Sequence, residues 1–314
     1  MKLNKNITGS KRTVIALGTF DGVHKGHVQL LKTAVSQAHE HNLMSMVFTF
    51  KYPPAQYFNK KVRLLTDFPT KQHLIKSVGI NQVVWVEFDQ EFAGIPAEKF
   101  IKEIIFSQLN AAMVICGYNY RFGYKALGDW QLLKQLGLEL GFGVKVIPPL
   151  NYQQTAISST RIRKILEQGD VSLAAQLLGR YQSYFGCVVP GKKIGRQLGF
   201  PTANFQVDPQ LVLPKSGVYL TWCYMTDGSS YPSMTSIGSN PTVKGKQVSI
   251  ESFILNFEGD LYGQIIELQF LQRLRSIKRF KSIEQLKAQL TYDQAHVLKL
   301  LPEYRLQGRR IVLK

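Results

Sequence analysis

Hydrophobic and polar positions alternate along the first half of the chain in two different periods. Short runs rich in β-branched and aromatic residues match buried strands, and four of them stand out: residues 13–18, 43–50, 82–88 and 111–117. Segments 26–42 and 96–109 lie between these runs and carry apolar residues three and four positions apart, as amphipathic helices do. Strands that alternate with helices predict βαβ units and a parallel, Rossmann-like sheet.

After about residue 180 the hydrophobic pattern changes. Short aromatic and β-branched runs are now separated by clusters of Gly, Pro, Asn and Ser: residues 183–189, 217–225, 248–257 and 264–274. This spacing is typical of an antiparallel barrel or sandwich. A last helical pattern covers residues 282–300, with Ser282 as its expected N-cap. We therefore expect two domains, an α/β domain at 1–180 and a mainly antiparallel β-barrel with a terminal helix at 181–314.

The composition excludes several classes of protein. A hydrophobic fraction of 45% provides a core, and no apolar run approaches the roughly 18 residues that span a bilayer. The basic start of the chain has no apolar segment behind it, so we expect no signal peptide. Cys116, Cys187 and Cys223 have no C-x-x-C spacing, which disfavours a disulfide framework or a zinc site and favours reduced thiols in the cytoplasm.

The net charge adds an expectation about partners. The formal charge is +18, and the basic excess is spread over both halves of the chain instead of forming a tail. Such a field attracts anions in general, whether they are nucleotides, nucleic acid or acidic lipid headgroups. Charge alone does not choose among these partners, so the choice depends on the motifs.

The decapeptide GTFDGVHKGH, residues 18–27, ends the first predicted strand and begins the first predicted helix. A glycine turn at this place leaves the first backbone N–H groups and the positive end of the helix dipole available to a phosphate. His24 and His27 can add side-chain donors, and Gly26 allows a close backbone approach. A zinc site is the weaker alternative, because helix-borne zinc pairs usually stand four positions apart and no third ligand lies beside these histidines.

The decapeptide resembles the H-x-G-H motif of nucleotidylyltransferases, and in full it is most similar to the bacterial bifunctional riboflavin kinase/FMN adenylyltransferases, or FAD synthetases. Further stretches of the chain resemble the later motifs of this family, and they occur in the family's order. These stretches are GYNYRFGYKALGD at 117–129, ISSTRIRKIL at 157–166, LLGRYQSYFGCVVPGKKIGRQLGFPTANF at 177–205, then GVYL, SIGSNPTV, ESFILNFEGDLYG and LRSIKRFKSIEQL. The resemblance covers about residues 13–300. It implies a nucleotidylyltransferase fold for the first domain and a riboflavin kinase for the second.

For the first domain, the resemblance implies that FMN and ATP react to give FAD and pyrophosphate. The attacking phosphate is already anionic, so such a site mainly needs positioning and charge neutralisation. His24 and His27 are the expected catalytic residues, and Arg121 and Phe122 are expected at the flavin. The residues expected to bind the nucleotide are Gly18, Phe20, Asp21, Gly22, Gly26, Gly117, Asn119, Ser159, Thr160 and Arg163. From the residues alone, the last three fit an ordinary helix N-cap and a solvated arginine equally well.

For the second domain, the resemblance implies a kinase without a Walker loop, because GKKIGRQLGFPTAN lacks the G-x-x-x-x-G-K-[ST] order. Thr202 and Asn204 alternate along an extended stretch, so they face the same way and could hold Mg²⁺ with ATP. Glu251 interrupts an apolar strand and stands where the family has the base for the ribityl hydroxyl of riboflavin. The resemblance adds three glycines beside the nucleotide and an arginine beside the flavin: Gly191, Gly195, Gly199 and Arg275.

The chain departs from the family pattern at four places. Lys51 and Tyr52 stand where the family begins its D-P-H-P motif, and Asn119 replaces an aspartate. Phe253 replaces a histidine two positions after the base, and Ile277 replaces a glutamate. These departures leave an alternative open, in which only the riboflavin kinase half is efficient.

Two further alternatives concern the partners. One is nucleotidylyl transfer to another small acceptor, and the other is a basic nucleic-acid-binding protein on the same scaffold. No basic–aromatic stripe, recognition helix or zinc finger supports nucleic-acid binding. We therefore expect small-molecule substrates (riboflavin, FMN and ATP), no membrane partner, no specific nucleic acid, and a monomer or weak oligomer.

Overall fold

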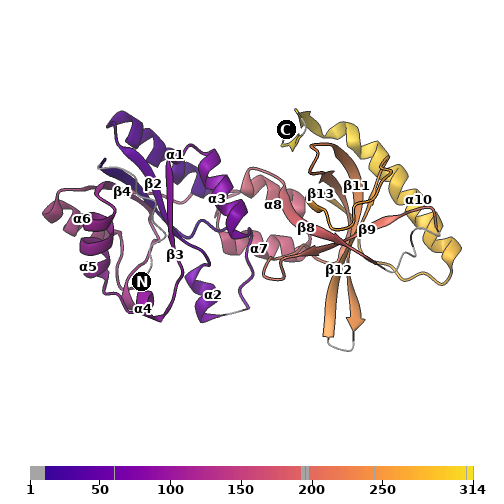
Figure 1. The fold of residues 1–314 in the computed structure, drawn as a ribbon, viewed down its shortest axis with the longest axis horizontal. Coiled ribbons are helices and arrows are strands. Elements are labelled where there is room, and N and C mark those ends of the chain that lie inside the picture. Colours follow the sequence, from indigo (N-terminus) through magenta and orange to yellow (C-terminus); the bar gives the residue numbers. More distant parts are fainter. Residues whose placement is uncertain are drawn as a thin grey trace. The chain divides into compact units, whose positions relative to one another are not determined.

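The computed structural model describes residues 11–59, 61–191, 195, 198–242, 245–308 and 310–313. The chain divides into two compact units, of which the first ends at Ser159 and the second begins at Thr160 (Figure 1). Six residues of the quoted motifs lie outside the described part: Lys192, Lys193, Ile194, Arg196, Gln197 and Val243. Each unit is described by itself below.

The first unit is built on a five-stranded sheet in the order β3-β2-β1-β4-β5. All four neighbouring pairs are parallel. Its strands are β1 (Thr13–Leu17), β2 (Met44–Phe50), β3 (Gln82–Val86), β4 (Ala111–Gly117) and β5 (Gly143–Ile147). The predicted parallel sheet is therefore confirmed, with β5 as a strand that the hydrophobic pattern did not reveal.

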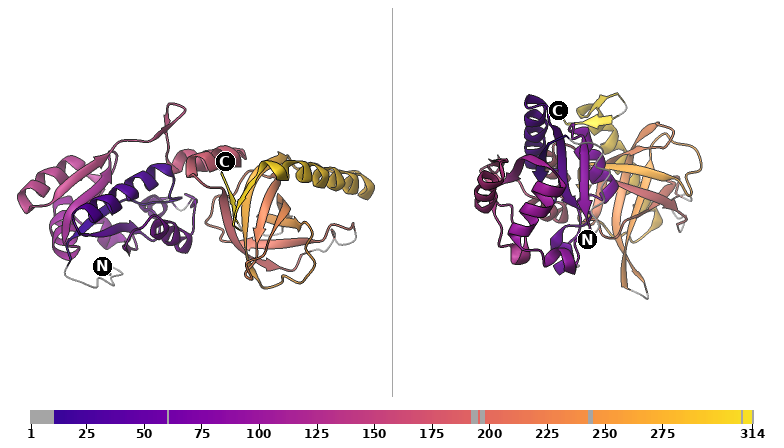
Figure 2. Two further views of the ribbon diagram at one scale, coloured as in Figure 1. Left: turned by 90° about the horizontal axis from the view of Figure 1, so that it is seen from above. Right: turned by 60° about the vertical axis from the view of Figure 1, so that its left-hand side comes forward.

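Helices cover both faces of this sheet (Figure 2). They are α1 (Lys25–Glu40), α2 (Pro54–Phe58), α3 (Phe68–Ser77), α4 (Gln90–Ala93), α5 (Ala97–Lys99) and α6 (Trp130–Leu140), with a π-helix at Phe100–Gln108 and a 3₁₀ turn at Tyr124–Ala126. Apolar residues of α1 and α3 pack on one face of the sheet. The other face is covered by the π-helix and α6. A two-stranded hairpin, β6 (Asn151–Tyr152) and β7 (Thr155–Ala156), follows the sheet.

The helix predicted at 96–109 contains wide turns. Only Ala97–Lys99 is an α-helix, and the π-helix Phe100–Gln108 continues it. The backbone N–H of Leu109 donates to the carbonyl five residues earlier, at Ile104. In this conformation the π-helix buries Phe100, Ile101, Ile104 and Ile105.

The second unit contains a closed barrel in the order β10-β11-β12-β9-β8-β13, and all of its pairs are antiparallel. The strands are β8 (Gln182–Val189), β9 (Thr202–Val207), β10 (Gly217–Tyr224), β11 (Ser230–Thr242), β12 (Gly245–Ile254) and β13 (Ile265–Arg275). The terminal helix α10 (Ile283–Leu300) begins at the predicted N-cap Ser282, whose hydroxyl accepts from Gln285 N. The barrel and its helix are therefore confirmed.

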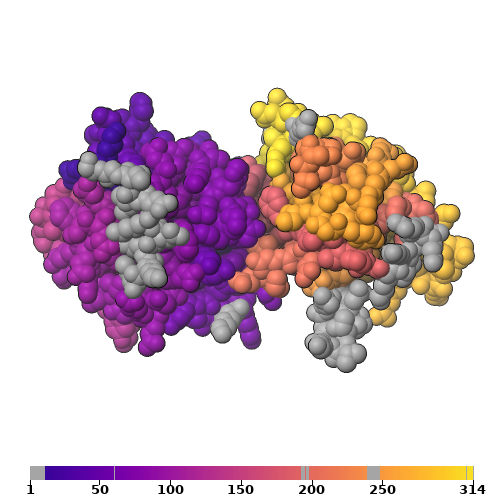
Figure 3. Space-filling view, viewed as in Figure 1, coloured from indigo at the N-terminus to yellow at the C-terminus, as the bar shows by residue number. Residues whose placement is uncertain are grey.

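Four further segments belong to the second unit, except for Ser159 at the start of the first of them. The helices α7 (Ser159–Gln168) and α8 (Val171–Leu178) precede the barrel, and a 3₁₀ turn (Leu301–Glu303) and the hairpin β14 (Arg305–Gln307) and β15 (Arg310–Val312) follow α10. Figure 3 shows the C-terminal segment, in yellow, at the surface of this unit. Among the described residues, no helix is long and apolar enough to cross a membrane.

Residues 160–180, which the sequence pattern placed with the first half, cluster with the barrel unit. The apolar side of α8 is buried and packs on β13 and β8. The Ser172 hydroxyl donates to Leu271 O at 3.2 Å, and Lys215 N donates to Leu166 O at 3.0 Å. These contacts account for the difference between the compact units and the boundary expected at 180.

The interior of the barrel contains a chain of buried hydroxyl groups. Thr221 Oγ1 lies 2.7 Å from Ser233 Oγ and 2.6 Å from Thr235 Oγ1, and Thr235 Oγ1 donates to Ser252 Oγ at 2.9 Å. All four residues are fully buried. Because side chains alternate along a strand, the neighbour Glu251 lies on the opposite, outer face of β12.

Candidate active sites

The loop between β1 and α1 follows the carboxyl end of a central strand. The strand order reverses at the β1–β4 pair, and in open parallel sheets ligands bind at the carboxyl ends of the strands where the order reverses. Residues 18–24 leave β1 there, and the loop after Gly117 leaves β4 beside it. The sheet therefore brings the two motif loops to neighbouring strand ends.

His24 is the N-cap of α1. Its Nδ1 accepts a hydrogen bond from His27 N at 3.2 Å, and its side chain is only 6% exposed. Since Nδ1 accepts, a neutral His24 ring carries its proton on Nε2 and can donate from that atom. The ring of His27 stacks on that of His24, with centroids 3.6 Å apart. The cap thus fixes both the tautomer of His24 and the pairing of the two imidazoles.

Two neighbouring residues make room for this histidine pair. A Cβ on Gly26 would lie 3.3 Å from the His24 ring, so glycine keeps the ring unobstructed. Phe20 packs edge-on against His27 at 5.3 Å between centroids. Both residues were expected to bind the nucleotide, and both contact the histidines.

The buried carboxylate of Asp21 stabilises the β1–α1 loop through hydrogen bonds. Its carboxylate is 2% exposed and accepts from Leu65 N at 3.0 Å and Thr66 N at 3.4 Å. Gly22 has φ +80°, and a Cβ there would lie 2.6 Å from the Leu65 side chain. The Ser159 hydroxyl donates to Asp21 O at 2.8 Å. These contacts anchor the loop to the segment before α3 and to the ISST motif.

Thr160 and Arg163 belong to the second compact unit, on α7. Thr160 is exposed and Arg163 is half-buried. Ser159 is thus the residue of this motif that the structure brings to the β1–α1 loop. The phosphate-binding role of Thr160 and Arg163 stays a prediction.

The loop after β4 separates its three predicted residues. Asn119 is exposed, whereas Phe122 is 7% exposed and packs against Phe100 at 5.3 Å between ring centroids. Arg121 pairs with Asp129 at 2.8 Å. Backbone donation from Leu132, with contributions from Gln131 and Arg121, lowers the pKa of the Asp129 carboxyl. Of the three, Asn119 and Arg121 are exposed and Phe122 is part of the core.

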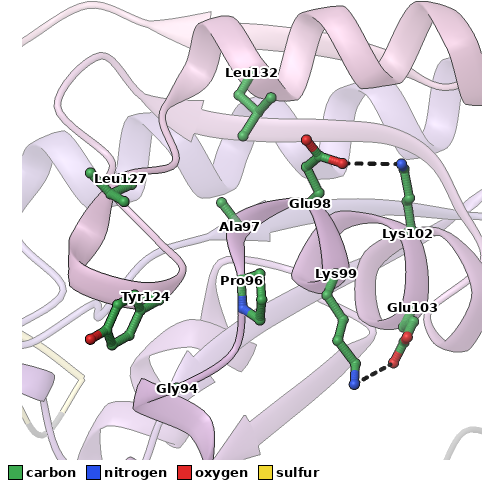
Figure 4. A pocket seen from close by; sticks show the side chains of 10 residues that line it. All are labelled: Gly94, Pro96, Ala97, Glu98, Lys99, Lys102, Glu103, Tyr124, Leu127 and Leu132. Carbon is green, nitrogen blue, oxygen red and sulfur yellow. Dashed lines mark hydrogen bonds and ion pairs between the residues drawn. The ribbon is translucent and has the colours of Figure 1, made fainter.

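A hollow of about 650 Å³ lies on the flank of this loop (Figure 4). Tyr124 and Leu127 of the loop form one side, and Pro96 and Ala97 form another. Ion pairs join Lys102 to Glu98 at 3.2 Å and Lys99 to Glu103 at 3.8 Å along the adjoining helices. No residue expected from the sequence to be in a site lines this hollow.

An exposed aromatic cluster at the ends of β2 and β3 was missed by the sequence analysis. Phe58 is 72% exposed, and its ring contacts those of Tyr57 and Phe88 at 5.2 and 5.7 Å between centroids. The signal was present in the stretch YPPAQYF, because aromatic residues there directly follow the carboxyl end of a buried strand. Beside the cluster, Lys51 pairs with Glu87 at 2.8 Å.

In the barrel unit, strand register gathers the predicted kinase residues. Glu251 on β12 pairs directly with Asn204 on β9, and Phe253 pairs with Thr202. Directly paired residues share a face, with Cβ atoms about 5 Å apart. The predicted base and the predicted metal ligands therefore lie together on the outer face of these two strands.

Two glycines lie close to these residues. A Cβ on Gly191 would overlap with the Asn204 amide, and one on Gly195 would overlap with Phe200 O. Gly199 has φ +83°, a conformation that suits glycine. Gly191 therefore allows the backbone to lie directly against the Asn204 amide. The amide oxygen of Asn204 and the hydroxyl of Thr202 are neutral oxygen ligands, which fit Mg²⁺ bound to ATP.

Replacing Gly191 with Ala is expected to lower kcat/KM for riboflavin phosphorylation by roughly tenfold to a hundredfold, because the new methyl displaces the Asn204 side chain. FAD formation from FMN is expected to be unchanged. Both rates are measured by chromatography of the flavin products. Gly143→Ala is the control, since its Cβ would meet only ordinary contacts, the nearest at 3.7 Å. Full kinase activity in Gly191→Ala would show that the close approach is dispensable.

Arg275, expected beside the flavin, is held by the terminal helix. Its Nε and Nη2 donate to the Asp293 carboxylate at 2.9 and 2.6 Å, and Gln289 adds a third donor to the same carboxylate. The Asp293 side chain is 3% exposed. This ion pair joins β13 to α10, and a role of Arg275 at the flavin stays a prediction.

Replacing Asp293 with Asn is expected to lower the free energy of unfolding of the barrel unit by about 3 kcal/mol, because it leaves the largely covered Arg275 guanidinium, 14% exposed, without its counter-charge. Thermal and urea unfolding of the full chain measure this change. Glu303→Gln, at an exposed acid just after α10, is the control and is expected to unfold as wild type does. Unchanged unfolding of Asp293→Asn would refute the anchoring role.

Comparison with known proteins agrees with this geometry. A family model described as FAD synthetase matches residues 6–161, and one described as riboflavin kinase matches residues 178–301. The bifunctional riboflavin kinase/FMN adenylyltransferase of Escherichia coli (strain K12) is 34% identical over 90% of this chain and 90% of its own. That of Haemophilus influenzae is 31% identical, over 93% of this chain and 97% of its own.

A solved structure is also similar over nearly the whole chain. It is described as a macrolide-efflux protein from Streptococcus pneumoniae, and it is 30% identical with a TM-score of 0.88. It covers 95% of this chain and 97% of its own.

The fold and the two clusters define a two-part protein, with a nucleotidylyltransferase-like α/β unit and a flavokinase-like barrel. The chain belongs to the bifunctional riboflavin kinase/FMN adenylyltransferase family. The family resemblance stated from the motifs is confirmed.

Proposed function

We propose that this protein phosphorylates riboflavin with ATP to give FMN, and then joins FMN to the AMP part of a second ATP to give FAD and pyrophosphate. One observation carries the proposal: each compact unit matches the family of one of the two reactions and holds its own cluster of motif residues. Adenylyl transfer is assigned to residues 1–180 and phosphorylation to residues 181–314, and the two family matches cover residues 6–161 and 178–301.

In the adenylyl step, a phosphate oxygen of FMN attacks the α-phosphorus of ATP and the bond to the β-phosphate breaks. His24 Nε2–H, His27 and the first N–H groups of α1 are assigned to the α-phosphate and the leaving pyrophosphate, whose charge rises in the transition state. Asn119 is assigned to the same nucleotide, and the nucleotide-binding role of Thr160 and Arg163 stays a prediction from the motif. Asp21, Gly22 and Ser159 serve this site by fixing the loop.

The flavin of the adenylyl step is assigned to the exposed aromatic cluster of Tyr57, Phe58 and Phe88. Edge-to-face rings at the carboxyl side of the sheet offer a flat isoalloxazine a surface for stacking. Lys51, which departs from the family, pairs with Glu87, and its ammonium lies over the rings of Tyr52 and Trp85.

In the kinase step, Glu251 is assigned as the base that takes the proton from the ribityl hydroxyl while that oxygen attacks the γ-phosphorus of ATP and ADP leaves. Thr202 and Asn204 are assigned to Mg²⁺, which would neutralise phosphate charge. The support is the register that pairs Glu251 with Asn204. Gly191, Gly195 and Gly199 are assigned to the ATP of this step, where the lack of a side chain allows the backbone to approach the nucleotide closely.

A product assay on the purified chain with ATP and Mg²⁺ tests the proposal, run once with riboflavin and once with FMN. FMN followed by FAD from riboflavin, and FAD from FMN, are the expected products. FMN that accumulates without FAD would reduce the function to a riboflavin kinase, and no product from either flavin would refute the proposal. A chelator should stop both reactions if Mg²⁺ is required.

The proposal also covers the cellular compartment, the oligomeric state and the partners of the enzyme. We place it in the cytoplasm as a monomer or weak oligomer without a specific nucleic-acid partner. The three cysteines are free thiols, which supports a reducing compartment. Size-exclusion chromatography with light scattering tests the oligomeric state.

A further inference from the structure

Lys71 on α3 is a buried lysine that no step described above uses. It is 2% exposed, and its Nζ lies 2.5 Å from Phe50 O and 3.4 Å from both Thr19 O and Lys51 O. An ammonium has three N–H donors, so these three carbonyls match its full capacity. A buried charge is tolerated when it is hydrogen-bonded in this way.

The three carbonyls stand at a particular place in the sheet. Phe50 ends β2, Lys51 follows it, and Thr19 follows the end of β1. Backbone groups at strand ends leave the ladder and need other partners. The Lys71 ammonium donates to carbonyls at the ends of both β1 and β2, which are neighbouring strands. The Thr49 hydroxyl is a second donor to Thr19 O, at 3.1 Å.

The charges around Lys71 favour its protonated form near neutral pH. Burial lowers the pKa of Lys71 to about 8, against the opposing attraction of the Asp21 carboxylate. The Phe68 ring lies 5.3 Å from the ammonium, and the side chain of Lys51 is turned to Glu87. Asp21 is thus the charged group that faces Lys71 from the β1–α1 loop.

We propose that Lys71 is a positioning residue for adenylyl transfer: its ammonium fixes the ends of β1 and β2, and so the loop that carries His24 and His27. This inference rests on the proposed adenylyltransferase function. The β1–α1 loop has a second anchor, which does not involve Lys71: Leu65 and Thr66, just before α3, donate their N–H groups to the Asp21 carboxylate. Removing the ammonium loosens one of two anchors and leaves the other in place.

The test compares Lys71→Met with Lys76→Met in the full chain. Methionine keeps the length of the side chain but removes the charge, and Lys76 is an exposed lysine on the same helix. We expect Lys71→Met to lower kcat for FAD formation from FMN about tenfold to a hundredfold, with KM for FMN and ATP within about threefold. Riboflavin phosphorylation and all rates of Lys76→Met stay unchanged. A kcat for Lys71→Met within about twofold of wild type overturns the proposal.

Lys71→Arg separates charge from structure, since arginine stays protonated. It should restore much of the lost kcat. We expect kcat of the wild type to fall above about pH 8, and Lys71→Arg should move this fall to higher pH. The sign follows from deprotonation: raising the pH removes the ammonium that holds the carbonyls. A Lys71→Arg variant as slow as Lys71→Met, or a fall at the same pH in Lys71→Arg and wild type, overturns the proposal.

Amide hydrogen exchange gives a readout that does not depend on activity. Peptides covering residues 18–27 should exchange at least about tenfold faster in Lys71→Met than in wild type, whereas the barrel peptides stay the same. Unchanged exchange at 18–27 overturns the inference. A wild-type protein that makes no FAD from FMN refutes the proposed function instead, and the exchange result then still decides whether Lys71 orders the loop.

Discussion

A Glu251→Gln variant should phosphorylate riboflavin about a thousandfold more slowly than wild type, while its conversion of FMN to FAD is unchanged. Glutamine keeps the shape of the side chain on β12 and removes the group that accepts the ribityl proton. The pairing of Glu251 with Asn204 concerns backbone and is expected to persist. Single-turnover assays with each flavin measure the two rates separately.

The matched control for this variant is Glu258→Gln, at an exposed acid in the turn that follows β12. It should keep both activities. Kinase turnover of Glu251→Gln near the wild-type rate would remove Glu251 from the role of base. Loss of both reactions would point to a folding defect, which the melting temperature would reveal.

A His27→Ala variant should lose FAD formation by about a thousandfold and keep FMN formation. The substitution removes a donor from the phosphate site and the ring that stacks on His24. The cap of α1 survives, because it is the backbone N–H of His27 that donates to His24. Steady-state assays of pyrophosphate release from ATP and FMN measure the loss.

Two further variants sharpen the second prediction. His73→Ala, at an exposed histidine on α3, should behave as wild type. His24→Asn keeps an N-cap acceptor for α1 but removes the Nε2–H donor, so it should fold normally and still lose adenylyl transfer. Equal loss of both activities in a folded His27→Ala protein would contradict two independent sites.

The elements with a strong local signal were predictable from the sequence. The run Ala111–Gly117 is uniformly apolar and became β4 with the expected limits. Ser282 before an amphipathic segment marked the start of α10 because capping is a local interaction. By contrast, β5 has exposed and half-buried positions at the sheet edge, so its pattern was too weak to predict.

The sites were predictable where a motif is contiguous and not where residues meet through the fold. His24 and His27 are three positions apart, so their pairing follows from one turn of chain. The contacts of Asp21 with Leu65 and of Arg275 with Asp293 join separate elements. Nothing local marks Lys71 as buried, because it lies in a polar stretch and its three partners are backbone carbonyls.

The hydroxyl chain inside the barrel has a consequence for how the kinase half reaches its native pairing. A slip of one residue between β11 and β12 would exchange the faces of β12, sending Glu251 inward and Ser252 outward. The slipped barrel would bury a carboxylate and separate the Thr235 hydroxyl from Ser252, and both errors are costly. The buried hydroxyl groups thus discriminate against misfolded pairings, and they fix which face of β12 carries the proposed base.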